Sequence, residues 1–157
     1  MSVVLYRIDD RLIHGQVMTA WTKVYNSTNI LCADDETAKN EMICSIMKLA
    51  VPSDFQLEIL TVNQAIDTIK ALPENKRTIV LAKSPATMLA LAEAEIGMKE
   101  LNVGNMGQGP GRKAVVRSTQ VSPEELKQLQ KIETLGIKVY FQSYPDGKSV
   151  NLNEIKL

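Results

Sequence analysis

Short apolar runs alternate along the chain with longer segments in which apolar residues recur every three or four positions. The short runs have the length of buried strands, and the longer segments have the period of helices that pack on one side. The runs predict strands over residues 3–6, 30–33, 57–60, 78–82, 100–103, 114–117 and 137–141, followed by a weakly specified tail. The longer segments predict helices over residues 16–25 and 37–50, and three more that begin near residues 62, 85 and 123.

The ends and buried sides of these helices carry their own signals. Thr61 and Ser122 each begin a capping box, Ser84 precedes a proline at a first helical position, and Gly136 is placed to stop the last helix. The helical period predicts two buried sides: Val17, Ala20, Trp21 and Val24 in the first helix, and Ala38, Met42, Ile46 and Leu49 in the second. Four methionines are expected to fill the core: Met42, Met47, Met88 and Met98.

Strands that alternate with helices over short connections predict an α/β fold built of right-handed βαβ units. Such units give an open, mostly parallel twisted sheet, here of about six to seven strands, with helices on both faces. No linker or repeat divides the chain, so we expect one domain over residues 1–157. Ligands of such sheets bind beyond the carboxyl ends of the strands, which directs attention to the loops that follow them.

The composition excludes several classes of function. Lys plus Arg and Asp plus Glu both number 18, and aromatic residues make up 4%, which argues against a nucleic-acid binder. Cys32 and Cys44 lie in apolar stretches and are expected to be buried thiols of a cytosolic protein. The N-terminal residues do not have the pattern of a signal peptide, and the apolar runs are too short for a membrane span.

The loop after the first expected strand holds the most reactive group of residues. His14 is the chain's one histidine, and Arg7, Asp9, Asp10 and Arg11 lie within seven positions of it. A neutral imidazole is a nucleophile near neutral pH, a carboxylate can fix its tautomer, and an arginine can hold a phosphoryl group through two hydrogen bonds. The start of the following helix also favours an anion. These parts suit a histidine that accepts and passes on a phosphoryl group, and a solvated histidine beside surface ion pairs is the alternative.

Three other polar loops each have a structural and a functional interpretation. The Gly-rich stretch 104–113 fits no nucleotide-binding motif, because residues typical of a strand follow it, and is expected to be a flexible loop or a contact for an anion or partner. The acids at 34–36 either cap the next helix or hold Mg²⁺. Lys83 is placed to reach a phosphate at the sheet edge, and Ser84 suits either a phosphate contact or a plain helix cap.

The first of these loops resembles a known signature. Arg7-Ile-Asp-Asp-Arg-Leu-Ile-His14-Gly-Gln-Val17, followed by Trp21, is similar to the motif of the IIB components of the mannose/fructose/sorbose family of the bacterial sugar phosphotransferase system. The resemblance covers nearly the whole chain, through Ala33-Asp-Asp-Glu-Thr-Ala38, Leu101-Asn-Val-Gly-Asn-Met106 and the segment 122–142. Asp34, where the family often has Asn, and the many glycines of residues 104–113 depart from the family pattern.

The resemblance implies a phosphoryl relay and adds an antiparallel edge strand to the expected sheet. It implies that His14 accepts a phosphoryl group on Nδ1 from a phosphohistidine of the IIA protein or domain, and that Arg11 helps to pass the group to a hexose or amino sugar. The sugar is held by the membrane proteins IIC and IID. The implied activity is that of a protein-Nπ-phosphohistidine–sugar phosphotransferase, which works in the cytoplasm against its membrane transporter.

The remaining motif residues are expected to bind or orient the phosphoryl group: Arg7, Asp9, Asp10, Gly15, Lys83 and Ser84. Positive charge at Lys83, Arg112 and Lys113 is expected to face IIA, whose phosphoryl group is an anion. The scheme needs no metal, nucleotide or other cofactor and no nucleic acid, and it leaves an oligomer possible.

Two alternatives come from other classes of protein. A receiver-like module phosphorylated on aspartate shares the acidic pair Asp9-Asp10 and the late Lys83, but the segment after the third expected strand has no acceptor aspartate. A scaffold protein would tolerate replacement of His14. Phosphohistidine is lost in acid and survives base, whereas an acyl phosphate is lost in base, so the stability of a phosphorylated adduct separates the alternatives.

Overall fold

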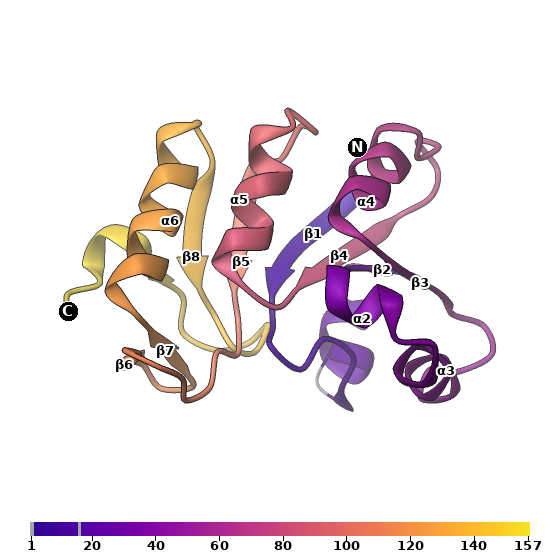
Figure 1. The fold of residues 1–157 in the computed structure, drawn as a ribbon, viewed down its shortest axis with the longest axis horizontal. Helices are drawn as coiled ribbons and strands as arrows, with labels where there is room; N and C mark the ends of the chain where they lie inside the picture. The colour runs from indigo at the N-terminus through magenta and orange to yellow at the C-terminus, as the bar shows by residue number, and fades with distance from the viewer. Residues whose placement is uncertain (1, 16) are drawn as a thin grey trace.

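A parallel sheet forms the centre of the molecule. The computed structural model describes residues 2–15 and 17–157. Within these residues a seven-stranded sheet has the order β3-β2-β4-β1-β5-β8-β9 (Figure 1). Its strands are β1 (Val3–Ile8), β2 (Asn29–Ala33), β3 (Gln56–Leu60), β4 (Thr78–Ala82), β5 (Glu100–Val103), β8 (Lys138–Phe141) and β9 (Val150–Asn151). All neighbouring pairs are parallel except β8 and β9, so the expected sheet with an antiparallel edge strand is confirmed.

Helices pack on both faces of the sheet, as the sequence predicts. The π-helix η1 (Val17–Trp21), α1 (Thr22–Val24), α2 (Asp35–Lys39) and α3 (Glu41–Leu49) belong to the connections β1–β2 and β2–β3. The other connections contain α4 (Val62–Lys70), α5 (Pro85–Glu93) and α6 (Pro123–Thr134), and the 3-10 turn η2 (Leu152–Glu154) follows β9. Side chains alternate along each strand, so Leu5 packs with Val17 and Trp21, while Tyr6 and Ile8 pack with α4 to α6.

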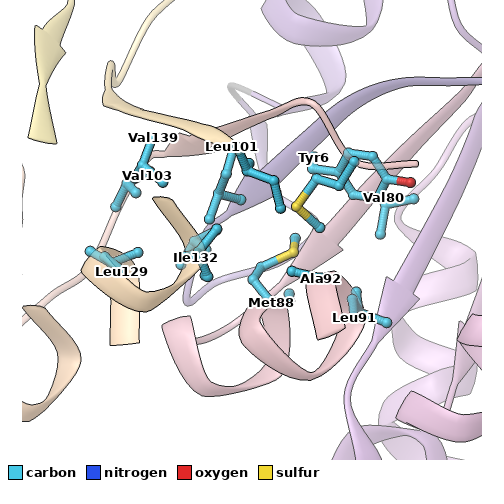
Figure 2. Packing of buried hydrophobic residues seen from close by; sticks show 14 of the residues in the cluster. Tyr6, Val80, Met88, Leu91, Ala92, Leu101, Val103, Leu129, Ile132 and Val139 are labelled. Atoms are coloured by element: carbon cyan, nitrogen blue, oxygen red, sulfur yellow. The ribbon is translucent and has the colours of Figure 1, made fainter. Parts of the chain in front are cut away.

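The larger core lies between the sheet and helices α5 and α6. Figure 2 shows Met88, Leu91 and Ala92 of α5 beside Tyr6 and Val80, and Ile132 of α6 beside Leu101 and Val139. The residues of this core are at most 8% exposed, so folding removes nearly all of their apolar surface from water. The caps that begin and end these helices agree with the sequence: Thr61, Ser84 and Ser122 each accept a backbone N–H three residues on, and Gly136 has φ +86°.

The predicted helix over residues 37–50 is two helices, and its predicted buried side is wrong. Asn40 has extended backbone angles and caps α3 by accepting the N–H of Ile43, so the chain turns between α2 and α3. The turn separates only Ala38 from the predicted side; within α3 it is Met47 that packs inward, and the rest of that side is not covered by the described residues. Met42, Ile46 and Leu49 are 72%, 57% and 86% exposed, so Met42 is not a core residue.

The segment over residues 16–25 is helical from Val17, whereas residue 16 lies outside the described residues. Val17 and Trp21 are buried as predicted, but Val24 is 61% exposed. A π turn holds more residues than an α turn, so the phase of the apolar period has slipped when the chain reaches Val24.

Two strands differ from the sequence-based expectation. The predicted strand over 114–117 is β6 (Lys113–Val116), and it pairs with β7 (Thr119–Val121) in a separate antiparallel hairpin instead of joining the sheet. The edge strand β9 comes from the tail that carried no clear signal.

Cys32 is buried, Cys44 is half-buried, and both are free thiols. Among the described residues, no helix has the length and apolar character needed to cross a bilayer.

Candidate functional site

The site lies where the connections of two neighbouring strands leave the sheet over opposite faces. The chain leaves β1 toward η1, which packs on one face, and leaves β5 toward α6, which packs on the other. Neighbouring parallel strands with this property form a crevice beyond their carboxyl ends, where α/β proteins bind ligands. The loops after β1 and β5 supply the polar side chains found there.

Asp9 is the centre of this site. It follows β1 directly, and its side chain is 0% exposed. Three groups meet its Oδ2 atom: His14 Nε2 at 2.6 Å, Asn105 Nδ2 at 3.1 Å and Arg7 Nη2 at 3.2 Å. The backbone N–H of Arg11 donates to Oδ1 at 3.1 Å. A buried carboxylate is tolerated when it is paired and fully hydrogen-bonded, and this one is.

The contacts of Asp9 determine its charge. Burial by itself raises the pKa of Asp9, but the hydrogen bond with His14 and the positive charge of Arg7 outweigh burial, so the pKa lies below its ordinary value. An ionised carboxylate only accepts hydrogen bonds, so His14 donates from Nε2. In the neutral ring, Nδ1 then carries the lone pair.

A tight turn returns His14 to Asp9. The N–H of Leu12 donates to the carbonyl of Asp9 at 3.0 Å, and Leu12 has φ +55°, in the left-handed region. Such a backbone conformation is unfavourable for a leucine. Burial of the Leu12 side chain in the smaller core, which contains Val17 and Trp21, offsets the cost. The turn leaves the His14 side chain 10% exposed, so one edge of the imidazole is open to solvent.

Arg7 binds the Asp9 carboxylate and is itself held by backbone carbonyls and by Trp21. Its guanidinium donates to the carbonyls of Gln142 and Ser143 and lies 4.7 Å from the centre of the Trp21 ring. Burial lowers the pKa of Arg7, whereas the charge of Asp9 raises it. Gly104 leaves the space that the guanidinium fills, because a Cβ there would lie 2.2 Å from Arg7 Cζ.

The structure brings together some of the residues predicted for the site and separates others. Arg7, Asp9 and His14 form one cluster, and Arg11 joins it through its backbone while its side chain is exposed. Asp10 turns toward the loop after β5 and accepts the N–H of Gly107 at 2.7 Å.

The other predicted residues have structural contacts. Gly15 is exposed where the chain enters η1. Lys83 pairs with Asp34 at 3.6 Å, and Ser84 caps α5. Asp34 itself caps α2, so helix capping explains the acidic stretch after β2.

The Gly-rich loop is fastened in place rather than free. Arg112 forms a two-bonded ion pair with Glu125, at 2.7 and 2.8 Å, and donates to the carbonyl of Gly107. Arg112 is therefore a structural residue of the loop, in contrast to the exposed basic contact that the sequence suggested. Lys113 is exposed at the start of β6.

Sequence reasoning missed Asn102 and Asn105, which complete the cluster from β5 and its loop. Asn102 is fully buried, accepts from Arg7 Nη1 and donates to the carbonyl of Gln142. One signal was present, because Asn102 stands between Leu101 and Val103 in a strand, and a buried polar residue needs a partner. Asn105 carried no comparable signal.

Comparisons with known proteins identify the family and agree with the fold. Residues 3–157 match the family model described as PTS system sorbose subfamily IIB component. The chain is 28% identical over 153 residues to the sorbose-specific EIIB component of Klebsiella pneumoniae, covering 97% of this chain and 93% of the relative. The crystal structure of the IIBSor domain of the sorbose permease from that organism superposes with a TM-score of 0.90 at 27% identity, covering 98% and 95%. The mannose-specific EIIAB component of Escherichia coli (strain K12) is 29% identical over 141 residues, which are 88% of this chain and 43% of the relative.

The fold and the site define a class of protein: an α/β domain that holds a histidine against a buried carboxylate beyond the carboxyl ends of a parallel sheet. Within this class, the chain belongs to the sorbose-subfamily IIB components of the sugar phosphotransferase system. It is therefore a phosphotransferase of the phosphoryl relay that modifies sugars during uptake.

Proposed function

We propose that His14 Nδ1 accepts a phosphoryl group from a phosphohistidine of IIA and passes it to a sugar held by the membrane proteins IIC and IID. The contact of His14 Nε2 with Asp9 Oδ2 at 2.6 Å carries this proposal. It occupies one ring nitrogen and leaves the other as the nucleophile. The family membership supports the relay, and the position of the imidazole at the sheet edge supports His14 as its carrier.

The transfer from IIA to His14 needs no acid or base beyond these groups. The Nδ1 lone pair forms the new N–P bond while the N–P bond of the donor breaks and returns its electron pair to the donor imidazole. His14 becomes a phosphoimidazolium, protonated on Nε2, and the ionised Asp9 neutralises that positive charge. In the transfer to sugar, the hydroxyl oxygen forms the new O–P bond while the N–P bond breaks and its electron pair returns to Nδ1. The proton of the hydroxyl passes to water or to a base of the membrane proteins that hold the sugar.

Replacement of His14 tests the carrier. His14→Gln keeps a side chain that can donate to Asp9, so the fold should survive while labelling by phosphorylated IIA disappears. Unfolding of the variant in denaturant provides the folding control. The wild-type label should be lost in acid and kept in base. Labelling of His14→Gln at the wild-type rate, or a base-labile adduct, contradicts the proposal.

We assign to Arg11 the transfer toward sugar. The Arg11 side chain is exposed. Within the part of the chain that the structure describes, its guanidinium forms no hydrogen bond or ion pair. A free guanidinium beside the carrier can neutralise the oxygens of the phosphoryl group as its bond to His14 loosens.

Two rates on Arg11→Lys test this role. Phosphorylation by IIA should change little, because the donor contributes its own charges. Sugar phosphorylation in membranes that hold IIC and IID should slow by roughly 100-fold, the effect of one preorganised donor. Equal decreases in both rates would point to a structural role for Arg11. If neither rate decreases, Arg11 has no part in the mechanism.

The partners and location follow from the same scheme. The relative from Escherichia coli is an EIIAB component, so a donor joined to its acceptor occurs in a protein similar to this one. We expect the domain to work at the cytoplasmic side of its membrane partners. Lys83 and Lys113 are the basic residues that we propose to face IIA. Lys83 has one contact with Asp34 at 3.6 Å and a side chain that is 43% exposed, whereas Arg112 is 17% exposed and closely paired with Glu125, so we leave it out of the proposal.

A further inference from the structure

Asn105 joins the loop after β5 to the centre of the site. Its side-chain Nδ2 donates to Asp9 Oδ2 at 3.1 Å. Its backbone carbonyl accepts the N–H of Asp10 at 3.0 Å, and Gly107 donates in turn to the Asp10 carboxylate. The two loops are therefore fastened by contacts that do not involve the Asn105 side chain. The hydrogen bond of the Asn105 side-chain amide to Asp9 is therefore a separate contact.

The amide acts on the oxygen that holds His14. Arg7 approaches Oδ2 from within the protein, and the N–H of Arg11 holds Oδ1. Asn105 donates to Oδ2 through a neutral side-chain amide, and it reaches this atom from the loop after β5. Without Asn105, Oδ2 keeps Arg7 as its only donor besides His14 itself among the described residues, and the carboxylate is otherwise held through Oδ1 by the N–H of Arg11. A carboxylate that shifts by a few tenths of an ångström loosens its hydrogen bond to the imidazole.

We propose that Asn105 is a positioning residue of the relay: it fixes Asp9 Oδ2, and through it the His14 tautomer that exposes Nδ1. Its effect on phosphoryl transfer rests on the function proposed above, whereas its effect on the tautomer does not. An imidazole in the wrong tautomer presents N–H where the lone pair should be, and such an error is costly in other histidine–carboxylate pairs.

The single histidine of the chain makes the tautomer directly measurable. A protein labelled with ¹⁵N in the histidine ring has one Nδ1 and one Nε2 signal, both from His14. Above the titration of the ring, the wild type should show a protonated Nε2 and an unprotonated Nδ1. Asn105→Leu keeps the size of the side chain and removes the donor. Its signals should move toward those of a mixture of tautomers, and phosphorylation by IIA should slow by roughly tenfold or more, as for other groups that orient a histidine through a neighbour.

Asn105→Asp provides a variant with a different prediction. It places a second carboxyl about 3.1 Å from Asp9 Oδ2. The charged or titratable groups that surround this position are Arg7, Asp9 and His14, and Asp10 and Arg11 of the loop after β1. Two carboxylates this close share a proton, so the new group donates to Asp9 in acid and repels it when ionised. The phosphorylation rate relative to wild type, measured at each pH, should rise as the pH falls toward about 5. Asn63→Leu, an exposed asparagine after β3, is the matched control and should match wild type.

The outcomes separate the two proposals. Wild-type ring signals in Asn105→Leu, with or without a slower transfer, overturn the positioning role. A flat pH ratio for Asn105→Asp also overturns it. Altered ring signals in Asn105→Leu confirm the positioning role even if wild-type His14 takes no phosphoryl group, and that second result would reject only the proposed function.

Discussion

The end of β1 with the loop that follows it, and helix α3, differ from the usual distribution of polar and apolar residues in opposite directions: the first buries charged side chains and the second exposes apolar ones. Arg7 and Asp9 are charged and 0% exposed, whereas Met42 and Leu49 are apolar and 72% and 86% exposed. Charged side chains are rarely buried without a partner, and these two are buried against each other with further hydrogen bonds from Asn105 and the backbone. Met42, Ile46 and Leu49 are exposed together on α3, but an apolar side chain in water needs no partner of its own. The comparison shows that the buried charges of the site depend on many specific hydrogen bonds and ion pairs. The exposed apolar side chains of α3 need no such contacts.

Removal of Arg7 should have the largest effect. Arg7→Met keeps the length of the side chain and leaves Asp9 buried without its charged partner, which should lower the free energy of unfolding by about 3–5 kcal/mol. Denaturant unfolding measures it, and Lys127→Met, at an exposed position, is the control. A loss below about 1 kcal/mol would show that the other donors suffice for Asp9, and the comparison would fail at its buried end.

Gly104→Ala tests the space around the guanidinium. The new Cβ would lie 2.2 Å from Arg7 Cζ, so the buried cluster must shift, at a cost of roughly 1–3 kcal/mol. Gly15→Ala is the matched control, because a Cβ at that position would have nothing within 4 Å of it. Thermal unfolding of both variants checks the pair. Equal melting temperatures would mean that Arg7 moves aside without loss.

The charge of Asp9 should appear as a pH dependence of stability. The pKa of Asp9 is lower in the folded protein than its ordinary value of about 4, so the folded state gains stability from its ionised form above that pH. The gain is lost as the pH falls through the folded pKa. The stability difference between wild type and Asp9→Asn should be constant near pH 7 and shrink below about pH 4. A difference that grows in acid contradicts the assignment.

The smallest effect is expected on α3. Leu49→Ala should change the free energy of unfolding by less than about 0.5 kcal/mol, because the side chain is already in water. Leu91→Ala, in α5 and 0% exposed, should cost about 2–5 kcal/mol and serves as the contrasting helix position. A loss at Leu49 that depends on protein concentration would show that α3 is covered in solution, which would end the contrast with the site.

Much of the fold could be predicted from local signals. The strands over β4 and β5 match their predicted bounds, and the caps at Thr61, Ser84 and Ser122 were readable because a cap is satisfied within four residues. The hairpin of β6 and β7 and the edge strand β9 were not, since short strands depend on which neighbour they pair with. The burial of α3 failed for a similar reason: a helical period identifies an apolar side but not what covers it.

The sequence by itself determined the order of strands and helices, the caps, and the grouping of Arg7, Asp9, Arg11 and His14 in one loop, because those features arise from neighbours along the chain. Only the tertiary structure decided that Asp9, rather than Asp10, holds the imidazole, and that Asn105 reaches it from a strand connection 96 residues away. It also decided that Arg7 lies beneath the site against Trp21. The physical reason is that a parallel sheet aligns the carboxyl ends of distant strands at one edge, and the hydrogen bonds made there depend on register and burial that no local pattern encodes.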